Sequence, residues 1–79
     1  MKLQEAVAKR LKDLLAEKGI SQYTLFKISG VPQSTISTIL NGAIKTIKLS
    51  TLHEICSGMG MDIYEFFNVE YLKNINIDN

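Results

Sequence analysis

The most constraining feature of the chain is residues 21–42, where a Gly-Val-Pro turn separates two short segments of helical pattern. Ser21 is of the type that caps the free amide groups at the start of a helix. Gly30 can adopt the positive φ that ends one helix, and Pro32 fits the first turn of the next helix but not its interior. Asn41-Gly42 is a C-terminal helix signal. The stretch therefore predicts two short helices joined by a tight turn.

The second of these helices has two contrasting faces. Ile36, Ile39 and Leu40 recur at i, i+3, i+4 and form its apolar side, as Leu25 and Ile28 do at i, i+3 in the first helix. The opposite side is polar without charge and carries Gln33, Ser34, Ser37 and Thr38. A merely solvated face usually carries Glu and Lys. Amide and hydroxyl groups instead donate and accept hydrogen bonds at base edges, so this face predicts contact with nucleic acid.

Charge is unevenly distributed along the chain, although its net value is only +1. Between Lys18 and His53 there is no Asp or Glu, and the four lysines of this block give it a charge of +4: Lys18, Lys27, Lys45 and Lys48. The last 26 residues hold one lysine and five acids, and so carry −4. A polyanion responds to the local field, so the acid-free block is the favoured DNA-facing part.

The rest of the chain predicts three more helices and a single domain. Residues 4–18 carry an apolar stripe, and residues 49–58 carry a second one, with Leu49, Leu52, Ile55 and Cys56 expected on the buried side. Asp62 and Glu65 form a capping box that opens a short fifth helix ending near Phe67. The expected fold is all-α, a compact five-helix bundle over residues 1–67. Residues 68–79 are expected to be a short C-terminal tail, disordered or in contact with a dimer partner.

Several classes of function are disfavoured. No apolar run approaches the length of a membrane span, and the polar start is unlike a signal peptide. The single Cys56 suits a reducing cytoplasm, with association with the nucleoid if DNA is the partner. There is no Gly-rich phosphate loop or carboxylate pair, so no enzyme activity and no cofactor are expected. His53 and Cys56 stand at i, i+3, but two ligands do not make a metal site, and none is predicted.

These residues resemble the helix-turn-helix of the Cro/phage-repressor (XRE-type) family of DNA-binding proteins. The residues that carry the resemblance are Ser21-Gln22, Gly30-Val31, Ser34-Thr35-Ile36-Ser37 and Asn41-Gly42. The resemblance covers residues 4–67 and implies a lambda-repressor-like fold whose second motif helix enters the major groove of double-stranded DNA.

The resemblance also implies site residues. Gln33, Ser34 and Thr38 match base-reading positions of the family, with Ser37 a weaker candidate one step round the helix. Gln33 leads, because an amide can bind adenine through N6 and N7. Gln22 matches the family's phosphate-binding glutamine. The other expected phosphate contacts are Thr35, Asn41, Lys45, Lys48 and Lys27.

The chain departs from the family at two points of packing. Many members carry an Arg–Glu ion pair at the positions of Leu15 and Leu40. An apolar pair can replace such a pair without loss of stability, so contact between these two leucines is predicted. Phe26 stands where a small residue is usual, which suggests a shifted angle for its helix.

Three functions remain open from the sequence. The favoured one is a sequence-specific transcriptional regulator, acting as a repressor and as a homodimer. Its dimer surface is sought among apolar residues of the last third, namely Met59, Met61, Tyr64, Phe67, Tyr71 and Leu72. The second is an antitoxin-type module whose acidic C-terminal third binds a basic protein partner. The third is a helical bundle that no longer binds DNA.

Overall fold

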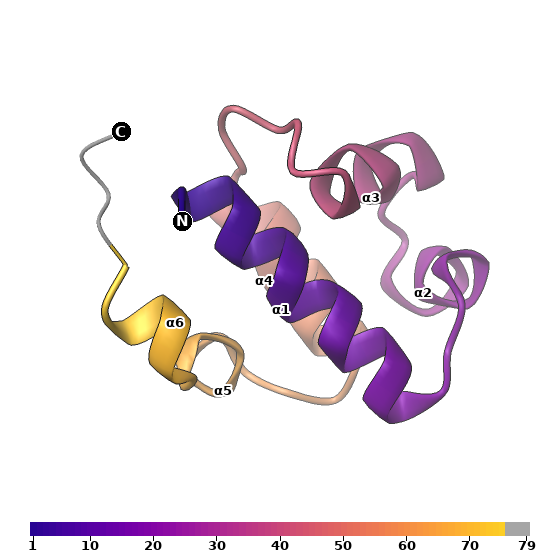
Figure 1. Cartoon of the computed structure of the whole chain (residues 1–79). Coiled ribbons are helices and arrows are strands. Elements are labelled where there is room, and N and C mark those ends of the chain that lie inside the picture. Colours follow the sequence, from indigo (N-terminus) through magenta and orange to yellow (C-terminus); the bar gives the residue numbers. More distant parts are fainter. Residues whose placement is uncertain (76–79) are drawn as a thin grey trace.

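The computed structural model describes residues 1–75, and over this range it is built of helices and loops (Figure 1). The helices are α1 Leu3–Lys18, α2 Gln22–Ser29, α3 Gln33–Leu40, α4 Leu49–Gly58, α5 Ile63–Phe67 and α6 Glu70–Lys73. The all-α fold and the first five helices are confirmed. The short helix α6 adds a sixth, within the segment that the sequence assigned to a tail.

One core holds these helices together. Each of the first five helices contributes a side chain that is at most 1% exposed: Leu11, Leu25, Ile36, Ile55 and Phe66. Helix α1 packs against α3 and α6, while α2 packs against both α3 and α4. Figure 1 shows α2 and α3 at one end of the molecule and α5 and α6 at the other. The motif is thus carried on a scaffold made by α1 and α4.

Arg10 links α1 to α5. Its Nε donates to the main-chain oxygen of Phe66 at 2.7 Å, and its Nη2 donates to that of Glu65 at 2.8 Å. Carbonyls at the end of a helix lack partners within the helix, so the guanidinium satisfies two of them. The sequence does not reveal this role of Arg10, because its partners lie more than 50 residues away and leave no local pattern.

Helix α6 is fastened to α1. Leu72 is buried, and the hydroxyl of Tyr71 donates to Asp13 Oδ2 at 3.3 Å. The ammonium of Lys9 lies 5.1 Å from the centre of the Tyr71 ring and forms an ion pair with the same Asp13 oxygen at 3.2 Å.

Two apolar residues assigned to buried helix faces are in fact exposed. Leu49 is 70% exposed and Ile28 is 46% exposed. Each lies three positions from a buried leucine of its own helix, Leu52 and Leu25, which turns it about 60° away from that side chain. Each also stands near one end of a short helix. The i, i+3 spacing of apolar residues in these two helices therefore did not show which of them are buried.

Gly58 has a packing role that the sequence did not reveal. A Cβ atom placed on it would lie 2.9 Å from Cα of Ser29 and 3.0 Å from the main-chain oxygen of Ile28. Such distances are too short for a side chain, so glycine at this position permits the close approach of α4 to α2. The sequence predicted only the end of a helix here.

Candidate DNA-binding surface

Local hydrogen bonds fix the start of α2 and the turn between α2 and α3. The hydroxyl oxygen of Ser21 accepts a bond from the amide of Thr24 at 3.0 Å, as an N-cap does. Gly30 adopts φ 77°, the left-handed conformation expected at the end of α2. Val31 is buried, and its amide donates to the hydroxyl of Ser29 at 3.1 Å. The relative direction of α2 and α3 is therefore set by the turn and by a buried side chain within it.

Helix α3 presents the polar face that the sequence predicts. Ile36 and Ile39 are buried on its inner side. On the outer side Gln33, Ser34 and Thr38 are exposed, while Ser37 and Thr35 are half-buried. The face has amide and hydroxyl groups and no charge, so it can exchange hydrogen bonds with base edges without an ion-pair partner.

The structure brings together the leading base-reading candidate and the leading phosphate candidate. The side-chain amide of Gln22, in the first turn of α2, donates to the main-chain oxygen of Gln33 at 3.2 Å. A carboxamide nitrogen has two protons, so Gln22 retains one for an acceptor such as a phosphate oxygen. The side chain of Gln33 itself remains exposed.

Thr38 has part of its hydrogen-bonding capacity already used. Its hydroxyl donates to the main-chain oxygen of Ser34, one turn earlier, at 2.8 Å. The hydroxyl proton is therefore committed within the helix, whereas the oxygen can still accept and the methyl group can contact a thymine methyl. Thr38 can therefore accept a hydrogen bond from a donor group on a base or make an apolar contact with one.

The loop after α3 is anchored by apolar side chains and exposes its lysines. Ile44 and Ile47 pack against the core, while Lys45 and Lys48 are exposed. Lys48 directly precedes α4. The two isoleucines thus hold the loop to the bundle, while the two lysines place positive charge on its exposed side.

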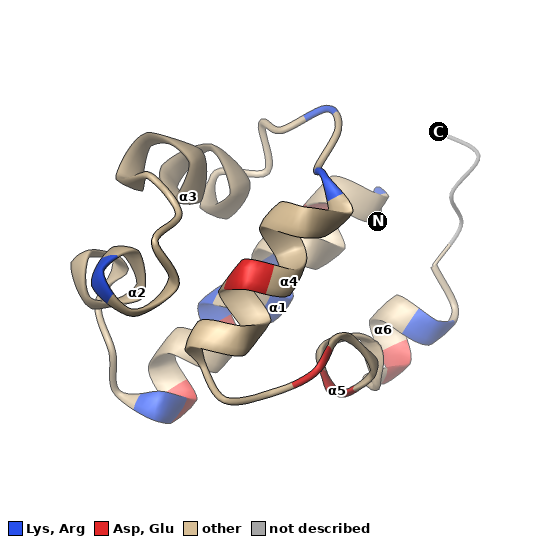
Figure 2. Cartoon of the chain, turned by 180° about the vertical axis from the view of Figure 1, so that it is seen from behind, with Lys and Arg blue, Asp and Glu red and all other residues tan. Residues whose placement is uncertain are grey.

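Charge separates over the molecule as the sequence predicts. In Figure 2, α2, α3 and the loop after α3 carry only basic charges, while acids mark α4, α5 and α6. Lys27 is exposed on α2, with its ammonium 5.9 Å from the centre of the Tyr23 ring. Asn41 is exposed at the end of α3. All of the predicted phosphate contacts therefore lie on α2, α3 or the loop.

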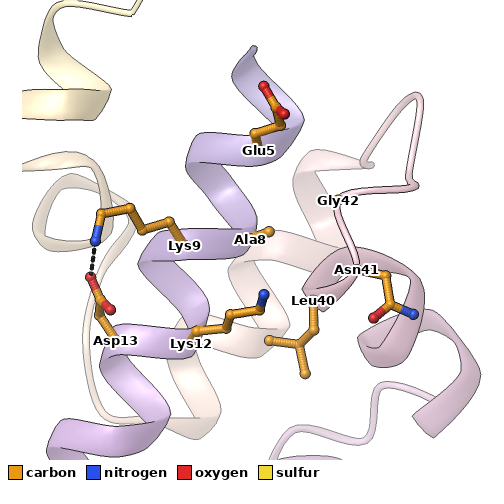
Figure 3. A pocket seen from close by; sticks show the side chains of 8 residues that line it. All are labelled: Glu5, Ala8, Lys9, Lys12, Asp13, Leu40, Asn41 and Gly42. Carbon is orange, nitrogen blue, oxygen red and sulfur yellow. Dashed lines mark hydrogen bonds and ion pairs between the residues drawn. The ribbon is translucent and has the colours of Figure 1, made fainter. Parts of the chain in front are cut away.

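A groove between α1 and the end of α3 contains a residue that sequence reasoning did not single out. Its volume is about 380 Å³, and its lining includes Lys9, Lys12, Leu40 and Asn41 (Figure 3). That residue is Lys12, whose distance from residues 21–42 in the sequence hides its position beside α3. Leu40 belongs to the same apolar cluster as Leu15, and direct contact between these two side chains stays a prediction.

His53 and Cys56 do not form a common site, because His53 is exposed and Cys56 is buried. Within residues 1–75, no three side chains of the metal-binding types lie close enough to hold an ion. None of the helices described here is long and apolar enough to cross a membrane.

A family model described as the Cro/C1-type HTH DNA-binding domain matches residues 10–70. The chain belongs to this family. Its Cro/C1-type domain extends from within α1 to the start of α6 and includes α2, the turn and α3. No curated protein and no solved structure matches the chain. Membership identifies a DNA-binding domain of the helix-turn-helix class.

Proposed function

We propose that the chain is a sequence-specific transcriptional regulator that binds double-stranded DNA by placing α3 in the major groove. The observation that carries this proposal is the outer face of α3, which is exposed, uncharged and rich in hydrogen-bonding groups within a Cro/C1-type domain. A recognition helix of this class reads base edges with residues near its N-terminus. Gln33 and Ser34 stand there.

Four residues of α3 are proposed to read bases. Gln33 is the principal one, since its amide can bind adenine N6 and N7 together. Ser34 lies beside it, and Thr38 presents an acceptor oxygen and a methyl group one turn further on. Ser37 is half-buried and is assigned a smaller contact at the edge of this face.

The proposed phosphate contacts surround the base-reading face. Gln22 donates its remaining amide proton, and the unpaired amide groups of the first turn of α2 add to its attraction for an anion. Lys45 and Lys48 supply charge from the loop. Thr35, Asn41 and Lys27 complete the set. Phosphate contacts of this kind fix the register of α3 on the duplex, while the base contacts give sequence preference.

We further propose a homodimer formed through the outer face of α4. Among the dimer residues suggested by the sequence, Met59 and Leu72 are buried and are unavailable. Tyr64 is 74% exposed, and Leu49, at the start of α4, is 70% exposed. Figure 2 shows α4 uncovered on this side of the molecule. Leu49 on α4 and Tyr64 on α5 are thus large apolar side chains left exposed, of the kind that a contact between two copies covers.

A two-fold dimer would place its two α3 helices on successive turns of the duplex, about 34 Å apart. The molecule measures 33 × 22 × 21 Å, so two copies side by side can span this separation. A dimer seated on two adjacent turns excludes other proteins from that DNA. Repression is therefore the regulatory outcome we propose.

Titration with duplex DNA at increasing salt concentration tests the proposal. Each neutralised phosphate contributes about −0.9 to the slope of log affinity against log salt. We expect a steep slope for the native chain and a smaller one for Lys45→Gln. Lys73→Gln, on α6 at the far end of the molecule, is the matched control and should leave the slope unchanged. Absence of salt-dependent binding to any duplex would overturn the proposal.

A further inference from the structure

Lys12 lies beside the recognition helix with its charge uncommitted. It is exposed on α1, and in Figure 3 its side chain extends toward Leu40, where α3 ends. It lines the groove together with Asn41, which is a proposed phosphate contact. In the part of the chain that the structure describes, the one ion pair is Lys9–Asp13, so the ammonium of Lys12 has no acidic partner there.

Lys9, the other basic residue of the groove, is already paired. Lys9 turns away from α3 and meets Asp13 at 3.2 Å, as Figure 3 shows. Asp13 also accepts a bond from the hydroxyl of Tyr71, and Glu5 accepts one from the main-chain amide of Lys2 at 2.7 Å. Of the two basic side chains that line this groove, Lys12 is therefore the one that remains free to meet an anion from outside.

We propose that Lys12 binds a phosphate of the DNA backbone at the C-terminal end of α3, next to the phosphate assigned to Asn41. The inference rests on the proposed function, since it assumes that DNA lies along the outer face of α3. A lysine suits this role because its compact charge, on a flexible stem, can meet a phosphate as a point charge.

Lys12 and Gln22 would contact the DNA backbone at opposite ends of α3. Gln22 holds the N-terminal end of α3 through the main chain of Gln33, whereas Lys12 stands at the other end. The eight residues of α3 rise about 12 Å, so the two side chains must meet different phosphates. Two anchors at opposite ends fix the inclination of the helix in the major groove, which a single anchor does not.

A purely structural role for Lys12 has a different signature. A positive charge near the end of α3 can stabilise the carbonyl groups of its last turn. That role would lower the melting temperature of Lys12→Gln and leave the salt dependence of DNA binding unchanged. Gln is a good helix former, so the substitution does not disturb α1 itself.

Salt titration of two matched variants tests the proposal. Lys12→Gln and Lys9→Gln change the net charge equally, on the same helix and in the same groove. We expect Lys12→Gln to reduce the magnitude of the slope by about 0.9, as loss of one phosphate contact does. Lys9→Gln should retain the native slope, and Lys12→Arg should restore it. Equal slopes for native protein and Lys12→Gln, with native binding still salt-dependent, would overturn this inference and leave the proposed function intact.

A scan of the DNA locates the contact. Single methylphosphonate groups, which carry no charge, are placed in turn along both strands of a selected duplex. We expect one position at which the neutral group weakens binding of the native protein but not of Lys12→Gln, because that variant has already lost the contact. If every position affected both proteins equally, Lys12 would have no phosphate partner and the proposal would fail. If the native protein bound no duplex, the proposed function would fail first.

Discussion

The side-chain amide of Gln22 donates to the main-chain oxygen of Gln33 at 3.2 Å, so the first turn of α2 holds the first residue of α3. This bond links two residues that we propose to take part in DNA recognition. The residue proposed to meet a phosphate also positions the backbone of the residue proposed to read a base. A shift in one is transmitted to the other through a single side chain.

Replacing Gln22 by Ala should therefore weaken DNA binding more than it weakens folding. The substitution removes the bond to Gln33 and the proposed phosphate contact, and loss of about 1.4 kcal/mol corresponds to tenfold weaker binding. The measurement is the dissociation constant for a selected duplex at fixed salt. Thermal unfolding should change little, because the bond is exposed to water. Unchanged affinity would show that Gln22 has neither role.

Gly58→Ala should destabilise the fold and loosen the position of α2. The new Cβ would lie 2.9 Å from Cα of Ser29, and a main-chain atom cannot rotate away. Overpacking of this kind costs about 1–3 kcal/mol, which exceeds the gain in helix propensity of less than about 1 kcal/mol. Urea unfolding measures the difference. Ser57→Ala, its exposed neighbour on α4, is the control and should stay within about 0.5 kcal/mol of the native protein.

Arg10→Lys should cost stability although it keeps the charge. Arg10 donates to the main-chain oxygens of both Phe66 and Glu65, and lysine lacks the planar fork that makes this possible. Loss of these bonds at a part-buried site should lower the free energy of unfolding by about 2 kcal/mol. Lys9→Gln breaks an exposed ion pair one position away and should cost less than about 1 kcal/mol. Equal effects of the two substitutions would contradict the assigned role of Arg10.

Cys56 should make stability fall at alkaline pH. Burial in the core, with a smaller contribution from the charge of Asp62, raises the pKa of its thiol from 9.0 to about 11. The folded protein then holds the proton to a higher pH than the unfolded chain does. The contribution of the protonated thiol to the free energy of unfolding is therefore complete below pH 9 and is lost as the pH approaches 11.

The measurement is urea unfolding under reducing conditions from pH 8 to pH 10.5, roughly the range over which the thiol titrates. Cys56→Ala leaves a small cavity and should be less stable at every pH, but its stability should fall less steeply than that of the native protein. Tyr71, whose pKa is raised by burial and then by Asp13, titrates in both proteins and cancels in the comparison. Parallel curves would mean that the thiol is not protected from ionisation.

The sequence predicted the elements whose signals are local. Ser21, Gly30 and the Asp62–Glu65 capping box all stand within a few residues of the groups they satisfy, and the structure has each of them in that role. The exposed polar face of α3 followed from helical spacing in the same way.

Features that depend on distant neighbours did not follow from the sequence. In the sequence, Arg10 looks like a surface charge, and its role follows only once α5 is placed against α1. Lys12 likewise looks like a surface charge until α3 is placed against α1. The packing role of Gly58 was not predicted, because no local pattern reveals the approach of Ser29. Helix α6 has only four residues and is held by Leu72 and Tyr71 against α1, so tertiary contacts stabilise a helix too short to form alone.

The central claim is that the outer face of α3 reads DNA sequence, with Gln33 foremost. Selection from random duplex DNA, carried out in parallel with the native chain and Gln33→Ala, tests it most directly. The account predicts that the native chain selects a site with two related half-sites about one helical turn apart. It predicts that Gln33→Ala loses its preference at one base pair of each half-site and keeps its preference at the other base pairs. The discrimination lost at that base pair should be about 1–3 kcal/mol. Selection of the same site with undiminished preference by both proteins would contradict it, as would the absence of any selected site.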